Sequence, residues 1–516
     1  MKKILIAICI LVIATSCNED YLKTPSLTQI AEGNFWQSEA DAFLALNGVY
    51  SSLQGGAFYG GGLNAWQGIP GYDCLGDNAF NGYKWEGPGV FMEGNYDPTN
   101  GQFEGIWNDS YRGIARVNGV IKNVEEISED LVSLETKEAL LGQAYFLRAL
   151  IYFNLSVYFE DAPLITAPQT LDEAYVSKNT FAEITEQIRE DLKFAIEALP
   201  ASHPDNLYGY ATKGAALGLF ARVQLYNKEY SDSQYGVLKL TQDAMALGYS
   251  LHPNYGELFT PVNETSPEIV FSVRFFANPA SNNGETFSAT YRGTPKVDQR
   301  PMPNLVNDYY CVDGLPIASS PLYNAADKGL NRDPRALATI YFKGDQFFDD
   351  PVRIFPGNGP TKFGMRKYIR RGPDADGNTE YGSGSQDFYV LRYADILLMR
   401  AEALAETGDI SSATGLINQV RARVGMPSVE SVEGAVNQQE MIAIVRHERR
   451  VELALEGTRF MDLKRWGTIE EAFNRAIADG IGPYNPQYRG GKSEKFPIPQ
   501  GEIDVNPNLV QHPDWQ

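Results

Sequence analysis

Residues 138–165 read EALLGQAYFLRALIYFNLSVYFEDAPLI, and the spacing of apolar residues in this stretch predicts a long helix. The residues of one helical face recur every three or four positions, at Leu140, Ala144, Leu147, Ile151 and Leu155. Aromatic residues make the other faces apolar as well, at Tyr145, Phe146, Tyr152 and Phe153. A helix that is apolar nearly all round is packed on several sides. We therefore expect this helix to lie inside the protein.

Helical patterns continue beyond this stretch and return near the C-terminus. Thr180 and Glu183 form a capping-box sequence, which predicts the start of a helix. Residues 393–407 carry another apolar face, Gly408 ends it, and Asp409 can cap the next helix. Helices joined by so tight a turn form hairpins, and several hairpins favour a tetratricopeptide-like stack. The expected fold class is mainly α, a tetratricopeptide-like helical-hairpin scaffold with loop-rich insertions that carry short strands.

Two blocks have a composition that cannot sustain regular helices. They are rich in Gly, Pro and Asn, and they lie at about 55–101 and 249–390. Loops on a rigid scaffold usually carry recognition, so we expect these insertions to bind the ligand. Residues 36–516 then form one composite unit, with its helical scaffold mainly in 102–247 and 391–480.

The charge of the chain narrows the class of ligand. Its 516 residues include 44 Lys and Arg against 65 Asp and Glu, a formal net charge of −21. Nucleic acid binding requires basic patches that neutralise phosphates, so this balance argues against a nucleic acid partner. Aromatic residues make up 12% of the chain, and those outside the core suit flat, weakly polar ligands such as sugar rings.

The N-terminus has the pattern of a lipoprotein leader. Two lysines precede the apolar run 4–13, which is too short to span a bilayer, and small residues then lead to Cys17. We expect residues 1–16 to be a signal peptide, Cys17 to be acylated and residues 17–35 to form a tether that anchors the protein to the membrane. The alternative is an ordinary secretory peptide in which Cys17 is incidental.

Two further cysteines lie in the mature chain. Cys74 and Cys311 can pair in an oxidising compartment, but two buried thiols are at least as compatible with the sequence. The cysteines lack the spacing of a metal site. The sequence predicts no metal and no cofactor.

Seven blocks, in order and behind the leader, resemble the SusD/RagB family of nutrient-uptake outer-membrane lipoproteins. The first three are CNEDYLKTP (17–25), WNDSYRGIARVN (107–118) and QAYFLRALIYFNLSVYFEDAPLI (143–165). The others are ATKGAALGLFARVQLY (211–226), LRYADILLMRAEALAETGD (391–409), RHERRVELALEGTRFMDLKRWG (446–467) and FPIPQGEIDVNPNLVQHP (496–513). The resemblance covers nearly the whole chain.

This resemblance implies a SusD-like fold with four tetratricopeptide-like units. It implies a TonB-dependent, SusC-like outer-membrane transporter as partner, an oligosaccharide or polysaccharide as ligand, and no catalysis. The location implied is the outer membrane, lipid-anchored and facing the exterior, and the acidic residues after Cys17 resemble a surface-export signal. Some members of the family bind peptides, so a peptide-binding uptake lipoprotein is the first alternative.

Sugar recognition needs aromatic faces for the C–H side of the ring and planar polar groups for its hydroxyls. The two loop-rich blocks contain this mixture. The ligand-binding residues that we predict are Trp66, Asp73, Asn81, Tyr83, Trp85, Tyr96, Tyr291 and Arg292. For any single aromatic residue among them, packing within the loop is an equally good interpretation.

A secreted glycoside hydrolase is the second alternative, because such enzymes need only two carboxylates. Glu448 and Glu452 share one face of a helix expected at about 438–455, with Gly457 at its end. Several arginines lie close by in the sequence, and a carboxylate paired with Arg has a lowered pKa, the wrong direction for a general acid. We therefore predict an ion-pair network and no catalytic residue. The third alternative is a scaffold that binds the transporter but no soluble ligand.

Overall fold

The computed structural model describes residues 35–61, 68–82, 90–277, 284–288, 299–347, 350–370 and 384–516. Helices dominate these residues and the strands are few and short, so the predicted mainly helical fold class is confirmed. The longer helices are α2 (Glu39–Ser52), α3 (Gly101–Glu126), α4 (Leu134–Phe159), α5 (Phe181–Ala198), α6 (Lys213–Tyr226), α7 (Val237–Met245), α11 (Tyr393–Thr407), α12 (Ile410–Arg423), α14 (Gln438–Glu452), α15 (Arg459–Trp466) and α16 (Ile469–Ala478). The short ones are α8 (Tyr255–Leu258), α9 (Pro303–Asp308), α10 (Pro334–Thr339), α13 (Val429–Glu433) and α17 (Gln500–Val505).

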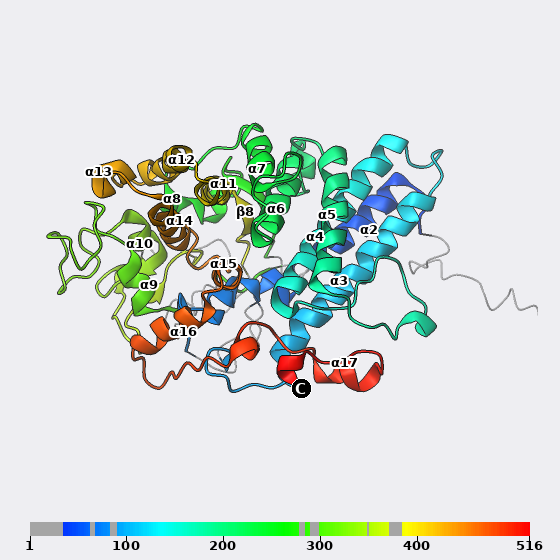
Figure 1. The fold of residues 1–516 in the computed structure, drawn as a ribbon. Coiled ribbons are helices and arrows are strands. Elements are labelled where there is room, and N and C mark those ends of the chain that lie inside the picture. The colour runs from blue at the N-terminus through cyan, green and yellow to red at the C-terminus, as the bar shows by residue number, and fades with distance from the viewer. Residues whose placement is uncertain are drawn as a thin grey trace, which may run out of the picture.

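The long helices form a stack in which each packs against the next. The order of contact runs from α2 through α3, α4, α5, α6 and α7 to α11, α12 and α14 (Figure 1). Helix α11 therefore joins the stack of the first half directly, through α7 and α6, and α12 and α14 pack on α11. The scaffold is continuous although 147 residues separate α7 from α11 in the chain.

Helix α4 lies at the centre of this scaffold, as its all-round apolar pattern predicts. Its side chains are buried continuously from Gly142 to Phe159, apart from the half-buried Tyr145. The helix is long and apolar enough to cross a membrane, but 89% of its most apolar window is buried inside the protein. Phe496, from near the C-terminus, stacks on Tyr158 with ring centroids 5.5 Å apart.

The predicted caps are present. The backbone N–H of Thr180 donates to Oε2 of Glu183 over 2.7 Å, and the N–H of Glu183 donates to the Thr180 hydroxyl, so the capping box of α5 is confirmed. Gly408 ends α11 with φ of 91°, and Asp409 caps α12 by accepting from the N–H of Ser412. The hairpin of α11 and α12 is therefore confirmed.

The end predicted for the helix at about 438–455 is wrong. Helix α14 ends at Glu452, and Gly457 lies in the turn that follows it. This glycine has φ of 75°, and a Cβ there would meet the backbone oxygen of Ile69 at 2.3 Å. Close packing against a segment distant in sequence requires the glycine, not helix termination.

Within the described residues, the strands form four separate two-stranded antiparallel sheets. Their pairs are β1 (Ala79–Asn81) with β3 (Gln299–Pro301), β2 (Ile269–Val273) with β8 (Phe388–Arg392), β4 (Ile340–Tyr341) with β7 (Gly364–Met365), and β5 (Gln346–Phe347) with β6 (Asp350–Ile354). Both loop-rich blocks contribute strands, and β8 leads directly into α11.

Cys74 and Cys311 are both buried thiols, and no disulfide joins them. Of the two states compatible with the sequence, the structure has the reduced one.

Candidate ligand-binding site

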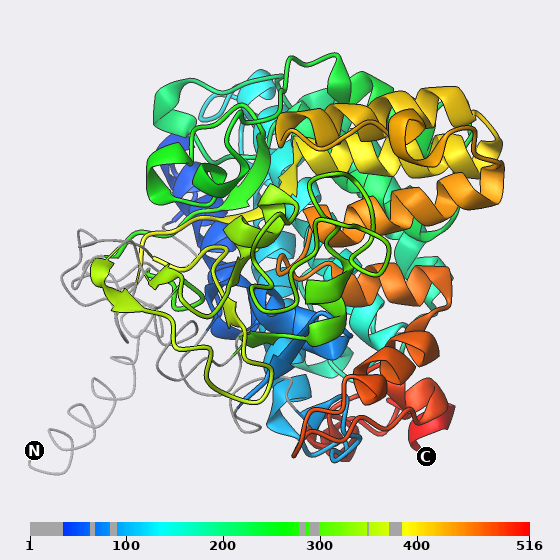
Figure 2. The same ribbon diagram turned by 90° about the vertical axis from the view of Figure 1, so that its left-hand side faces the viewer.

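The stems of the loop-rich blocks meet on one face of the scaffold. Strand β1 of the first block pairs with β3 of the second, and the N–H of Thr286 donates to the carbonyl of Gly60 over 2.9 Å. Glu285 and Gly384 form an isolated β-bridge, and the N–H of Arg370 donates to the carbonyl of Ser288. Figure 2 shows the blue N-terminal segments lying among the green middle segments on this side. Backbone bonds thus hold together loop stems that lie more than 200 residues apart.

Five of the predicted ligand-binding residues lie outside the described residues. They are Trp66, Tyr83, Trp85, Tyr291 and Arg292. Their role in binding stays a prediction. The described residues that border these segments belong to the stems, which include β1 and β3.

Asp73 is fully buried beneath this face and supports the backbone. Its carboxylate accepts from the side chain of Asn78 over 2.7 Å and from the backbone N–H groups of Leu455 and Gly457 over 3.1 and 2.6 Å. Burial raises the pKa of Asp73, and these three hydrogen bonds oppose that rise. In this arrangement Asp73 joins the first loop block to the turn after α14, with no surface open to a ligand.

Asn81 and Tyr96 are also buried. Asn81 lies in β1 opposite Gln299 and is 1% exposed. Tyr96 stacks on Phe91 with ring centroids 5.2 Å apart, and its hydroxyl donates to the carbonyl of Lys492 over 2.6 Å. For Tyr96, the structure supports the loop-packing interpretation that the sequence left open.

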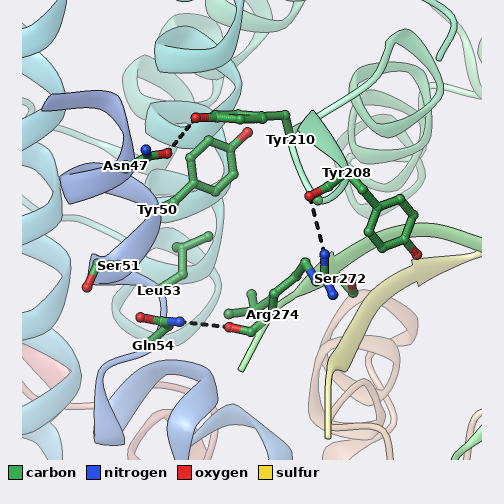
Figure 3. A pocket seen from close by; sticks show the side chains of 11 residues that line it. Asn47, Tyr50, Ser51, Leu53, Gln54, Tyr208, Tyr210, Ser272 and Arg274 are labelled. Atoms are coloured by element: carbon green, nitrogen blue, oxygen red, sulfur yellow. Dashed lines mark hydrogen bonds between the residues drawn. The ribbon is translucent and has the colours of Figure 1, made fainter. Parts of the chain in front are cut away.

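A hollow of about 260 Å³ opens beside the loop stems, between the end of α2, residues 208–210 and β2. Figure 3 shows the rings of Tyr50 and Tyr210 on one side of it and the side chains of Gln54 and Arg274 on another. The sequence analysis did not select these residues. The Tyr-Gly-Tyr sequence at 208–210, an aromatic pair around a glycine in a loop between helices, is a signal that points to them.

Hydrogen bonds fix the side chains around the hollow. The hydroxyl of Tyr210 donates to Oδ1 of Asn47 over 2.5 Å, and Nε2 of Gln54 donates to the carbonyl of Arg274 over 2.7 Å. The guanidinium of Arg274 lies 4.7 Å from the ring centroid of Tyr208. The walls of the hollow are therefore ordered by one another before any ligand arrives.

Two carboxyl groups lie next to Arg274. Oδ2 of Asp387 is 3.3 Å from Nε of Arg274, and the N–H of Asp387 donates to Oε1 of Glu264 over 2.7 Å. Burial, reinforced by the neighbouring Asp387, raises the pKa of Glu264 to about 8. Burial also raises the pKa of Asp387 to about 6, against the opposing effect of Arg274.

This pair should make the protein less stable as the pH rises from about 4.5 to about 8. Both carboxyls have higher pKa values in the folded protein than in an unfolded chain, so the folded state holds their protons more tightly. Their contribution is fully present below the ordinary carboxyl pKa and is lost as the pH rises through about 6 and about 8. Melting temperatures across this range should fall further for the wild type than for Glu264→Gln, which keeps an acceptor for Asp387. Parallel pH profiles for the two proteins would contradict this assignment.

The carboxylates at the end of α14 are bound by arginines, as predicted. Glu448 contacts Arg335 at 2.5 Å and Arg421 at 3.0 Å, and Glu452 contacts Arg423 at 2.6 Å. Burial alone would raise both pKa values, but the guanidinium groups lower them below the ordinary range. These two carboxylates are ionised and inaccessible, so they cannot serve as the acid and nucleophile of a glycosidase.

Over the described residues, no group of three or more His, Cys, Asp or Glu side chains is placed to hold a metal ion.

Two family models match most of the chain. Residues 267–515 match the SusD family, and residues 71–225 match a family described as starch-binding and associating with the outer membrane. The mainly helical, tetratricopeptide-like stack places the chain in the SusD-like class of folds. The chain belongs to the SusD/RagB family.

Relatives and solved structures share nearly the full length. SusD-like protein P25 of Formosa agariphila is 25% identical over 550 residues, covering 99% of this chain and 98% of the relative. A SusD-like carbohydrate-binding protein from Bacteroides fragilis is 29% identical, covers 92% of this chain and 100% of its own, and superposes with a TM-score of 0.79. A laminarin-binding SusD-like protein is 26% identical, with coverage of 92% and 99% and a TM-score of 0.73.

Proposed function

We propose that this protein is a lipid-anchored lipoprotein of the outer membrane that faces the exterior and captures oligosaccharides or polysaccharides. It delivers them to a SusC-like TonB-dependent transporter. The observation that carries the proposal is the convergence of two loop-rich blocks on one face of a rigid scaffold. Two proteins with the same fold and 26–29% identity are described as carbohydrate-binding and laminarin-binding, which supports a glycan as the ligand.

Capture without cleavage fits the chemistry of the described residues. The carboxylate pair that a hydrolase would need at the end of α14 is ionised and enclosed by arginines. The carboxyls with raised pKa values, Glu264 and Asp387, are used in bonds within the fold. Glu264 accepts from the backbone N–H of Asp387, and Asp387 accepts from the N–H of Phe275 and the hydroxyl of Ser272. A retaining glycosidase instead presents its two carboxyl groups to the substrate on either side of an open cleft.

The test is electrophoresis of the protein without residues 1–16 through gels that contain single polysaccharides. The panel holds the neutral glycans laminarin, starch and xylan and the acidic glycans alginate and polygalacturonate. Retardation by one of them, with no new reducing ends after incubation, would establish capture. Release of reducing ends would favour the hydrolase, and retardation by none would favour a peptide ligand.

Replacing Trp66 and Trp85 together by alanine should weaken glycan binding about tenfold or more, without lowering the melting temperature. Each indole that stacks on a sugar ring removes apolar surface from water, and alanine cannot replace that contact. Dissociation constants from the gel mobilities measure the effect. Tyr175→Ala, an exposed aromatic residue away from the loop stems, serves as the control and should bind as the wild type does. Unchanged affinity in the folded double variant would remove both tryptophans from the site.

A further inference from the structure

The hollow bordered by Tyr50, Tyr210 and Arg274 contains none of the eight residues that were predicted to bind the ligand. We propose that it is a second carbohydrate-binding site, which holds one neutral pyranose unit of a glycan. The inference rests on the proposed function only in taking a glycan as the ligand. The walls of the hollow come from α2, the 208–210 segment and β2, all of which are described.

One wall of the hollow is apolar and aromatic. The rings of Tyr50 and Tyr210 meet at 88° with centroids 5.1 Å apart, and Leu53 lies beside them (Figure 3). The hydroxyl of Tyr50 donates to Gln143 and accepts from the N–H of Ala211, so its ring is held in place. The C–H face of a pyranose packs on such a ring because both surfaces are weakly polar.

Planar polar groups flank this aromatic wall. Asn47 accepts from Tyr210 through Oδ1, and Gln54 donates to the Arg274 carbonyl through Nε2. Each amide therefore has its second polar atom, Nδ2 of Asn47 and Oε1 of Gln54, without a protein partner in the described part of the chain. A donor and an acceptor on opposite sides of an aromatic wall match the hydroxyl groups around one sugar ring.

The charges around the hollow favour a neutral ligand. Arg274 is the one cation among the lining residues, and Asp387 lies 3.3 Å from its Nε. The whole chain carries a formal charge of −21, which repels a polyanion over a distance. An acidic sugar would thus approach a site whose positive charge is already neutralised.

A neighbouring hollow fits a ligand longer than one ring. It measures about 310 Å³ and shares residues 208–210 and Ser272 with the first. Its far wall includes His203, Thr212 and Tyr249. Pockets for drug-sized ligands measure roughly 300–1,000 Å³. The two hollows lie just below and at the lower end of that range, so each has room for about one ring. A polymer that crosses the Tyr208–Tyr210 segment contacts both.

The test uses the same gels with the Asn47→Ala/Gln54→Ala double variant and with Tyr208→Ala. Both replace side chains that are at least partly exposed, so the melting temperature should stay close to that of the wild type. We expect binding of the neutral glycan that retards the wild type to weaken about tenfold in the double variant, since two hydrogen bonds are lost. Gln234→Ala/Asn474→Ala removes an exposed Gln and an exposed Asn elsewhere and should bind normally.

Each outcome separates this inference from the proposed function. Retardation of the wild type with no change in the folded hollow variants would overturn the second site and leave glycan capture standing. Stronger retardation by alginate or polygalacturonate, lost in the hollow variants, would overturn the neutral specificity. No retardation of the wild type by any of the five glycans would overturn both.

Discussion

Replacing Arg392 by alanine should lower the free energy of unfolding by about 3–5 kcal/mol. Arg392 is buried, and its guanidinium contacts three buried carboxylates at 2.6–2.9 Å, those of Glu268, Glu452 and Glu456. Alanine would leave the carboxylates with fewer cations in a medium that solvates charge poorly. Chemical denaturation followed by circular dichroism measures the loss.

The size of this effect depends on what Arg392 connects. The residue ends β8 at the point where α11 begins, and Glu268 immediately precedes β2 on the neighbouring strand. Glu452 and Glu456 lie at the end of α14 and in the turn beyond it. Arg392 therefore joins the second loop block to the C-terminal helices.

A surface arginine provides the matched control for Arg392. Arg112 is 67% exposed and forms one ion pair with Asp109 at 3.3 Å. Arg112→Ala should change the free energy of unfolding by less than about 1 kcal/mol, because exposed pairs contribute little. Equal losses of unfolding free energy in the two variants would show that burial does not increase the contribution of the Arg392 ion pairs to stability. Arg423 also contacts Glu268 and Glu452, and Lys367 contacts Glu456. A stable Arg392→Ala protein would show that these two cations suffice to neutralise the three carboxylates.

Replacing Asp73 by alanine should lower the free energy of unfolding by about 3 kcal/mol. The variant leaves the side chain of Asn78 and the N–H groups of Leu455 and Gly457 buried without an acceptor. Each unsatisfied donor costs roughly 1–3 kcal/mol, and some relaxation of the turn reduces the sum. Denaturant unfolding of the purified variant measures the change, with the exposed Asp130→Ala as the control.

The same variant distinguishes the two roles of Asp73. If it supports the backbone, stability falls, and the glycan affinity of the folded fraction changes only through the position of the loop stems. If it contacts the ligand, as the sequence predicts, affinity falls and stability does not. Loss of glycan affinity at unchanged stability would therefore contradict the structural role.

Buried ion pairs hold neighbouring helices of the scaffold in fixed positions. Arg148 pairs with Asp191 at 2.7 Å between α4 and α5, and Arg465 pairs with Glu402 between α15 and α11. Buried ion pairs add little net stability, but their directional hydrogen bonds are compatible with few alternative positions of the two helices. Arg400, which the sequence also places in an apolar helix, donates to the carbonyl of Leu238. Its partner is thus a backbone group of the neighbouring helix α7.

The sequence by itself determined the helices, their caps and the helical hairpins. The periodicity around Leu147, the Thr180–Glu183 capping box and the Gly408–Asp409 turn depend on residues within four positions of one another. Such signals can be read without knowing the rest of the chain. The order of the seven sequence blocks along the chain was also sufficient to indicate the SusD/RagB family.

Only the tertiary structure decided which of the described loop residues are buried. Asp73 and Tyr96 share the composition of the loops around them, yet Asp73 bonds to residues 382 and 384 positions away and Tyr96 to one 396 positions away. The hollow likewise joins Asn47, Tyr208 and Arg274 from three distant segments. Contacts of this kind depend on how the helices stack and where strands pair. Local composition contains no information about them, because burial is a property of the whole packed chain.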